Sequence, residues 1–136
     1  MRRLLFGVFL GLFVIMIAAC AASTASVSQV TMAHGYKDGS AVDPTTTFQP
    51  TDLVIHGVVT LANAPDDTKL KAVWTAVDAG GGQIKNQKIT ENEVTTGGTA
   101  DFTITSKDPW PAGSYKMDLY MNDTLVKTVP FTVAGS

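Results

Sequence analysis

Apolar and polar residues alternate along most of the chain beyond residue 28, and no long stretch shows the 3.6-residue apolar spacing of a helix. The alternation is clearest in residues 53–61, where one face carries Leu53, Ile55, Gly57, Val59 and Leu61. Residues 69–77 repeat it, with an inward face of Leu70, Ala72, Trp74 and Ala76. A period of two is typical of β-strands with one buried face. The pattern therefore predicts an all-β chain.

Turn residues divide the remaining pattern into further short strands. These are expected at Val30–Tyr36, Gln83–Thr90, Asp101–Thr105, Ser114–Met121 and Leu125–Val133. Residues 41–48 are predicted as a loop or a weak strand broken at Asp43-Pro44. The polar segment 83–90 is expected at a sheet edge, Asn122-Asp123 in a tight hairpin turn, and Pro130 at a bulge or edge. About seven short strands in one domain predict a two-sheet antiparallel sandwich.

Two segments resemble the immunoglobulin fold. Trp74 lies in the middle of the third main strand, and Gly113-Ser114-Tyr115-Lys116-Met117 is similar to the tyrosine corner of such domains. The resemblance implies that the Tyr115 hydroxyl turns to the backbone of the preceding loop. It also places Met117 where antibody domains carry their second disulfide cysteine, with Gly57 or Val59 opposite. We therefore expect an immunoglobulin-like β-sandwich over residues 29–136.

The N-terminal residues resemble the signal peptide of a bacterial surface lipoprotein. Two arginines precede an apolar run, Leu4–Ile17, which is followed by Ala18-Ala19-Cys20. The resemblance implies cleavage after residue 19 and attachment of lipid, including fatty acids such as palmitate, to the thiol of Cys20. Residues 20–28, rich in Ala and Ser, are then expected to be a flexible tether. The expected location is the cell membrane or outer membrane, facing the periplasm or the exterior.

Composition argues against several classes of partner and chemistry. From Cys20 onward the chain has no arginine and eight lysines against twelve acidic residues, a formal charge of −4, so nucleic acid is not expected as a partner. No Gly-x-Ser-x-Gly motif is present, and the single cysteine is assigned to lipid. We therefore expect no enzyme activity and no cofactor. The acidic residues that could still meet in space as catalytic pairs are Asp78, Glu91, Glu93 and Asp101.

An alternative hypothesis is a copper site. Met32 and His34 lie two residues apart, hence on one face of a strand, and His56 adds a third ligand of the type that copper prefers. Met117 and Met121 could contribute, but their spacing places them on an apolar face with Tyr115 and Leu119, which is typical of core methionines. The segment 38–43 resembles a calcium loop in its oxygen ligands, although Asp, Gly and Ser are also ordinary turn residues.

Aromatic residues near the end of the chain are candidates for a contact surface. Tyr120 is expected on an outward face beside Lys116 and Asp118, and Trp110 either joins this surface or closes one end of the sandwich. The predicted function is that of a cell-envelope lipoprotein, a non-catalytic binding or structural module for a protein or carbohydrate partner. The alternatives are an exported copper-binding protein using Met32, His34 and His56, or a minimal hydrolase.

Overall fold

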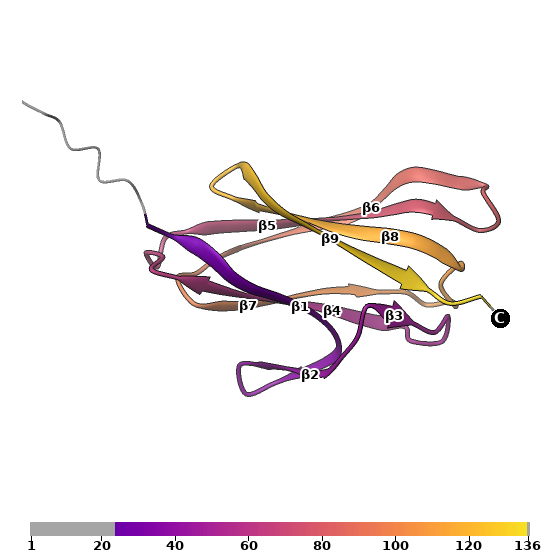
Figure 1. Ribbon diagram of the computed structural model, residues 1–136, viewed down its shortest axis with the longest axis horizontal. Coiled ribbons are helices and arrows are strands. Elements are labelled where there is room, and N and C mark those ends of the chain that lie inside the picture. Colours follow the sequence, from indigo (N-terminus) through magenta and orange to yellow (C-terminus); the bar gives the residue numbers. More distant parts are fainter. Residues whose placement is uncertain (1–23, 136) are drawn as a thin grey trace, which may run out of the picture.

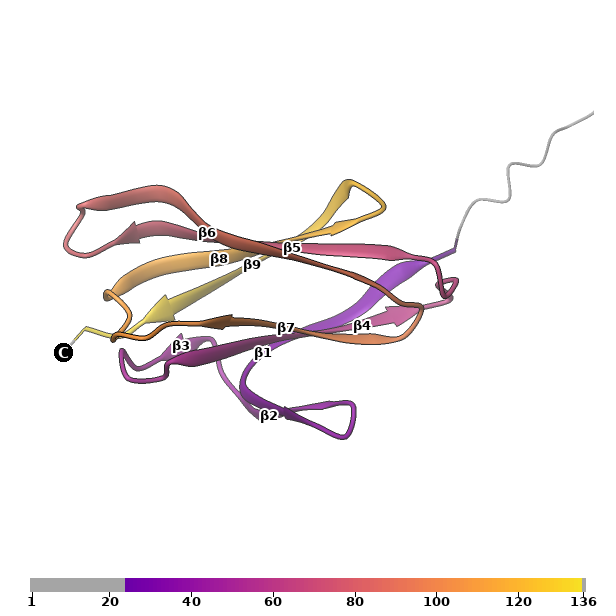
Figure 2. The same ribbon diagram turned by 180° about the vertical axis from the view of Figure 1, so that it is seen from behind.

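The computed structural model describes residues 24–135, which form nine β-strands in two facing sheets (Figures 1 and 2). The strands are β1 (Ser26–Lys37), β2 (Ser40–Pro44), β3 (Thr47–Phe48), β4 (Val54–Ala62), β5 (Lys69–Ala79), β6 (Ile84–Thr95), β7 (Thr99–Thr105), β8 (Gly113–Met121) and β9 (Thr124–Val133). One sheet has the order β2-β1-β4-β7 and the other β3-β9-β8-β5-β6. Among the strands of residues 24–135, only the short β3–β9 pairing is parallel. The predicted sandwich is confirmed, with nine strands rather than about seven. In the described range no helix is long and apolar enough to cross a membrane.

Several predicted boundaries differ from those observed. The first strand begins at Ser26, inside the range 20–28 that was expected to be a tether, and pairs with β4 from its first residue. Residues 41–48 contribute to two strands, which are separated at Thr45-Thr46 rather than at Asp43-Pro44. The edge strand β6 continues to Thr95, because its polar residues keep pairing with β5. Residues 1–23, which include Cys20, lie outside the described residues.

The core lies between the two sheets and follows the predicted alternation. Trp74 is fully buried, and its ring meets Phe131 edge to face. Gly57 lies on β4 opposite Met117 of β8, so close that a Cβ built on Gly57 would stand 2.6 Å from the Met117 Sδ. The expected contact at the antibody disulfide position is therefore made by a glycine and a methionine. The prediction that Leu53 faces inward is wrong, since Leu53 precedes β4 and is 36% exposed.

Trp110 and Tyr115 close the end of the sandwich near the C-terminus. The Tyr115 hydroxyl donates a hydrogen bond to the carbonyl of Pro111, which confirms the predicted tyrosine corner. The Trp110 Nε1 donates to the carbonyl of Asp52 at 2.9 Å, and its ring packs edge to face against Tyr115. Trp110 is buried. Of the two alternatives for Trp110, the closing of one end of the sandwich is confirmed, and a place on an exposed contact surface is wrong.

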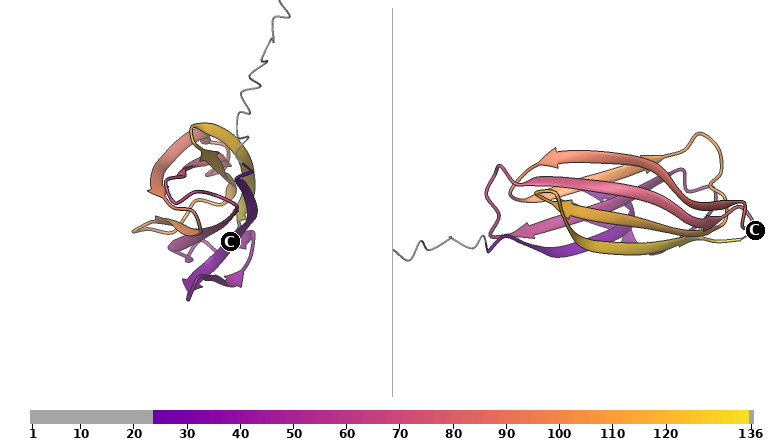
Figure 3. Two further views of the ribbon diagram at one scale, coloured as in Figure 1. Left: turned by 90° about the vertical axis from the view of Figure 1, so that its left-hand side faces the viewer. Right: turned by 90° about the horizontal axis from the view of Figure 1, so that it is seen from above.

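Residues 24 and 135 lie at opposite ends of the elongated sandwich (Figure 3). The end at residue 24 also holds the turn between β8 and β9, because Ser26 pairs with Ala62 and the loop after Ala62 leads to Lys69, which bonds to Asn122. Asn122 and Asp123 both have positive φ, 47° and 67°, as the predicted tight hairpin turn requires. This arrangement fixes which surfaces lie near the start of the folded domain.

Candidate binding surface

The outer face of the five-stranded sheet carries Tyr120 in a row of residues that crosses four strands. The strand registers place Leu125 of β9 opposite Tyr120, Tyr120 opposite Lys71 of β5, and Lys71 opposite Glu93 of β6. Directly opposed residues share a face of the sheet. The four side chains therefore form one continuous outward row.

The members of this row combine apolar and charged groups. Leu125 is 51% exposed, the highest value among the exposed large apolar residues of residues 24–135. The Lys71 Nζ lies 4.9 Å from the centroid of the Tyr120 ring, within the range of a cation–π contact. Tyr120 itself is half-buried. Tyrosine is among the residue types enriched at protein contact sites.

Asp118 occupies the next row and is buried rather than exposed, at 8%. One carboxylate oxygen accepts a 2.6 Å hydrogen bond from the Thr128 hydroxyl, and the other lies 3.2 Å from the Lys116 Nζ. Both oxygens are thus occupied within the sheet face. Asp118 positions Lys116 and Thr128, and the expectation that it contacts a partner directly is wrong.

An ion pair lies beside the row, on its side toward residue 24. The Lys69 Nζ lies 2.8 Å from an Asp123 carboxylate oxygen in the β8–β9 turn. The hydrogen bond from Lys69 and its positive charge lower the pKa of Asp123, and the hydrogen bond to Asp123 raises the pKa of Lys69. The pair stays ionised at neutral pH and ties the turn beside Leu125 to the start of β5.

The residues proposed as a copper site do not meet. Met32 is buried in the core and pairs with Gly57, whose face points inward, whereas the neighbouring His56 lies on the opposite, outer face of the same sheet. Among residues 24–135 no group of three or more His, Cys, Asp or Glu side chains is arranged to hold a metal ion. The alternative copper site of Met32, His34 and His56 is therefore not formed, because the sheet separates His56 from Met32.

Each histidine is instead engaged with carboxylates. His34 lies between Asp43, 2.9 Å from its Nδ1, and Asp52, 3.1 Å from its Nε2, so the two acids approach opposite edges of the ring. Partial burial lowers the pKa of His34, but the hydrogen bonds to Asp52 and to the Asp43 backbone, with the charges of both carboxylates, outweigh it and raise the pKa. His56 Nδ1 meets both carboxylate oxygens of Asp101, at 2.9 and 3.0 Å.

Among residues 24–135 the four candidate acidic residues do not gather in one cluster. Asp78 pairs with Lys85 and Glu91 with Lys88 on the five-stranded sheet, while Asp101 lies on the four-stranded sheet. The segment 38–43 forms the β1–β2 turn and strand β2, as the turn interpretation predicts. Of the four acidic residues that could meet in space, Glu93 and Asp101 line one pocket between β6 and β7, where the Asp101 carboxylate is engaged by His56.

Sequence reasoning found Tyr120 and Lys116 but missed Lys71 and Leu125. The alternation in residues 69–77 leaves Lys71 on the face opposite Leu70 and Ala72 but predicts no partner for it, and Leu125 is only the first residue of a predicted strand. Lys71 comes next to Tyr120 through the register of β5 with β8, and Leu125 through the register of β8 with β9, which shifts at Leu119/Tyr120. A one-residue shift of this kind leaves no signal in the alternation pattern.

The fold is that of known immunoglobulin-like proteins. An immunoglobulin-like protein from Pseudomonas aeruginosa matches 83% of this chain and 99% of its own length, with a TM-score of 0.55 at 14% identity. A β-glucosidase from Listeria innocua matches with a TM-score of 0.47 at 13% identity, and an alkylpurine DNA glycosylase from Pseudomonas fluorescens with 0.46 at 12%. These matches cover 82% and 85% of this chain but only 16% and 32% of the two enzymes. No protein-family model and no curated protein sequence matches the chain. The immunoglobulin-like sandwich is thus confirmed, and it is compatible with a non-catalytic binding module.

Proposed function

We propose that the protein is a non-catalytic binding module held at the cell envelope by lipid on Cys20. The observation that carries the proposal is the row of Leu125, Tyr120 and Lys71 on the outer face of the five-stranded sheet. Leu125 is half exposed beside the Tyr120 ring and does not belong to the core cluster. Its burial against a partner would be favourable.

The position of the row favours a protein of the same envelope as the partner. The row lies next to the β8–β9 turn, at the end of the sandwich where the described chain begins (Figure 1). Cys20 is four residues earlier, and four residues span at most about 14 Å. A lipid anchor on Cys20 therefore keeps Leu125 and Tyr120 close to the membrane, where another anchored protein is within reach.

The contact is tested by photo-crosslinking in cells that produce the full chain. A photoreactive phenylalanine analogue replaces Tyr120, and a discrete crosslinked species is expected on illumination. The matched control is the same replacement at Tyr36, an exposed tyrosine on the four-stranded sheet. Adding Leu125→Asp to the first variant should abolish the species, because a charge replaces the apolar contact.

Equal crosslinking from both positions, or none from position 120, contradicts the proposed surface. Tyr120→Ala should in addition leave the melting temperature nearly unchanged, because Tyr120 is only half-buried. A large loss of stability would assign Tyr120 a structural role instead.

The anchor is tested separately with Cys20→Ser. The unaltered chain should incorporate labelled palmitate and sediment with membranes, whereas Cys20→Ser should do neither, because the acceptor thiol is lost. Ala21→Ser serves as the control for a change near the cleavage site. Membrane association that survives Cys20→Ser would refute lipid anchoring while leaving the contact surface open to its own test.

A further inference from the structure

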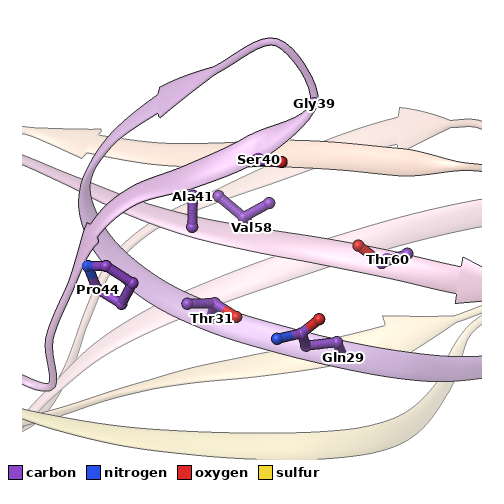
Figure 4. Close-up of a pocket in the computed structure, with 8 residues that line it drawn as sticks. All are labelled: Gln29, Thr31, Gly39, Ser40, Ala41, Pro44, Val58 and Thr60. Carbon is purple, nitrogen blue, oxygen red and sulfur yellow. The ribbon is translucent and has the colours of Figure 1, made fainter.

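The outer part of the β1–β2 hairpin, residues 34–44, lies outside the core. No residue from 34 to 44 belongs to the core cluster, and most residues of the hairpin beyond Gly35 are exposed. It turns at Asp38-Gly39, both with positive φ, and folds back over the outer face of the four-stranded sheet (Figure 4). Because of this cover, Val58 is only 5% exposed although it points outward from β4.

A groove of about 290 Å³ lies between the hairpin and the sheet (Figure 4). Its floor is formed by β1 and β4, and its wall by the hairpin from Gly39 to Pro44. None of the eight residues that line it is charged. The side chains that carry hydrogen-bonding groups are those of Gln29, Thr31, Ser40 and Thr60.

These four polar side chains are free to bind a ligand. Within residues 24–135 none of them has a side-chain hydrogen-bond partner. The three hydroxyls can each donate one hydrogen bond and accept others, and the Gln29 amide offers both functions. Val58, Ala41 and Pro44 supply apolar surface between them. The groove therefore alternates hydroxyl groups with small apolar patches.

The floor of the groove continues across the sheet. The registers of β1, β4 and β7 place Gln29, Thr60 and Thr99 in one row, and the next row contains Thr31, Val58 and Asp101. The Asp101 carboxylate is held in place by His56. A ligand lying in the groove can extend over this row toward Asp101, whose carboxylate accepts hydrogen bonds from hydroxyl groups.

We propose that this groove binds one or two sugar units of a neutral carbohydrate chain. A pyranose ring carries hydroxyl groups around its edge and C–H groups on its faces, which match the hydroxyl and apolar elements of the lining. The absence of charge in the lining disfavours an anionic ligand, which would lose its hydration without gaining a counter-charge. The groove volume is at the lower end of small-ligand sites, which suits a short segment of a chain.

The site lies on the sheet opposite to the proposed protein contact surface. The inference is therefore independent of the Tyr120 row, and either can fail alone.

The test uses the purified full chain labelled with nitrogen-15. Amide shifts are followed during titration with four neutral hexasaccharides, namely cellohexaose, maltohexaose, laminarihexaose and chitohexaose, up to about 10 mM. Oligogalacturonate serves as the anionic probe, and a neutral extended decapeptide of Ala, Ser and Thr as the peptide probe. We expect saturable shifts at Thr31, Val58 and Thr60 with at least one neutral sugar, and neither other probe should compete with it.

The variant Thr31→Val/Thr60→Val removes two hydroxyls and keeps the side-chain shape. Its affinity for the bound sugar should fall about ten- to hundredfold, because two hydrogen bonds are lost. Thr75→Val, on the outer face of the other sheet, is the matched control and should leave the affinity unchanged. Ala41→Leu should block the groove, provided that circular dichroism shows an unchanged fold.

The proposal is overturned if no neutral sugar produces saturable shifts, or if the shifts cluster around Tyr120. It is also overturned if the galacturonate or the peptide occupies the groove more tightly, or if the double variant binds as well as the unaltered chain.

Discussion

At the scale of single residues, Gly57 and Met117 set how closely the two sheets approach. The space that a Cβ at position 57 would need is taken by the Met117 Sδ and, at 3.3 Å, by the ring of Trp74. Immunoglobulin-like domains of the antibody type use a disulfide near this position, and here the same contact is made by packing. Position 57 therefore requires glycine, because Met117 and Trp74 fill the space of a side chain.

Gly57→Ala is expected to destabilise the domain by about 1–3 kcal/mol, because one methyl group must displace buried atoms. Gly35→Ala is the matched control, since its new Cβ would meet the Val42 Cβ at an ordinary 3.5 Å. Urea unfolding of both variants gives the comparison. Equal free energies of unfolding for the two variants would show that Met117 moves aside for the new methyl group without a loss of stability.

At the scale of elements, the β1–β2 hairpin is held by His34. The ring connects the hairpin through Asp43 to the segment before β4 through Asp52, and it packs edge to face on the buried ring of Phe48. This contact fixes the hairpin beside the groove. Because the His34 ring can take up a proton, the docking of the hairpin depends on pH.

The hairpin should be held more firmly in acid than in base. The pKa of His34 is raised above its ordinary value near 6.5 in the folded state, so the stabilisation is complete below 6.5 and is lost as pH rises through the folded-state pKa. Hydrogen exchange of amides 35–42, corrected for intrinsic rates, should show less protection at pH 8.5 than at pH 5.5.

His34→Gln should remove this difference, and His56→Gln, on the outer face of the same sheet, should keep it. Retention of the pH dependence in His34→Gln would refute the assignment to this ring.

At the scale of the whole molecule, both sheets share one core without a disulfide. Trp74 lies at its centre and Trp110 closes the end near the C-terminus, and the sequence contains no other tryptophan. Both rings pack on residues of the β8–β9 pair, Trp74 on Phe131 and Trp110 on Tyr115. The end and the centre of the sandwich should therefore unfold together.

This cooperativity can be measured with Trp74→Phe and Trp110→Phe, each of which leaves one fluorescent reporter. Within each variant the urea midpoint from fluorescence should coincide with that from far-ultraviolet circular dichroism, as in a two-state transition. An earlier fluorescence transition in Trp74→Phe would show instead that the end around Trp110 opens on its own.

Local patterns were enough to predict the strands and several contacts. The period of two located the core faces of β4 and β5, and the segment around Tyr115 predicted its corner hydrogen bond, because both depend on residues close together in the chain. The same reasoning failed for Asp118, whose burial is decided by neighbours from other strands.

The sequence by itself determined an all-β domain with Trp74 and Tyr115 at its centre and corner, since alternation and turn residues act locally. Only the tertiary structure decided the row of Leu125, Tyr120 and Lys71, and the groove under the β1–β2 hairpin. Both depend on strand register and on how a hairpin packs against a sheet. Those features arise from contacts between residues far apart in the chain, which no local pattern records.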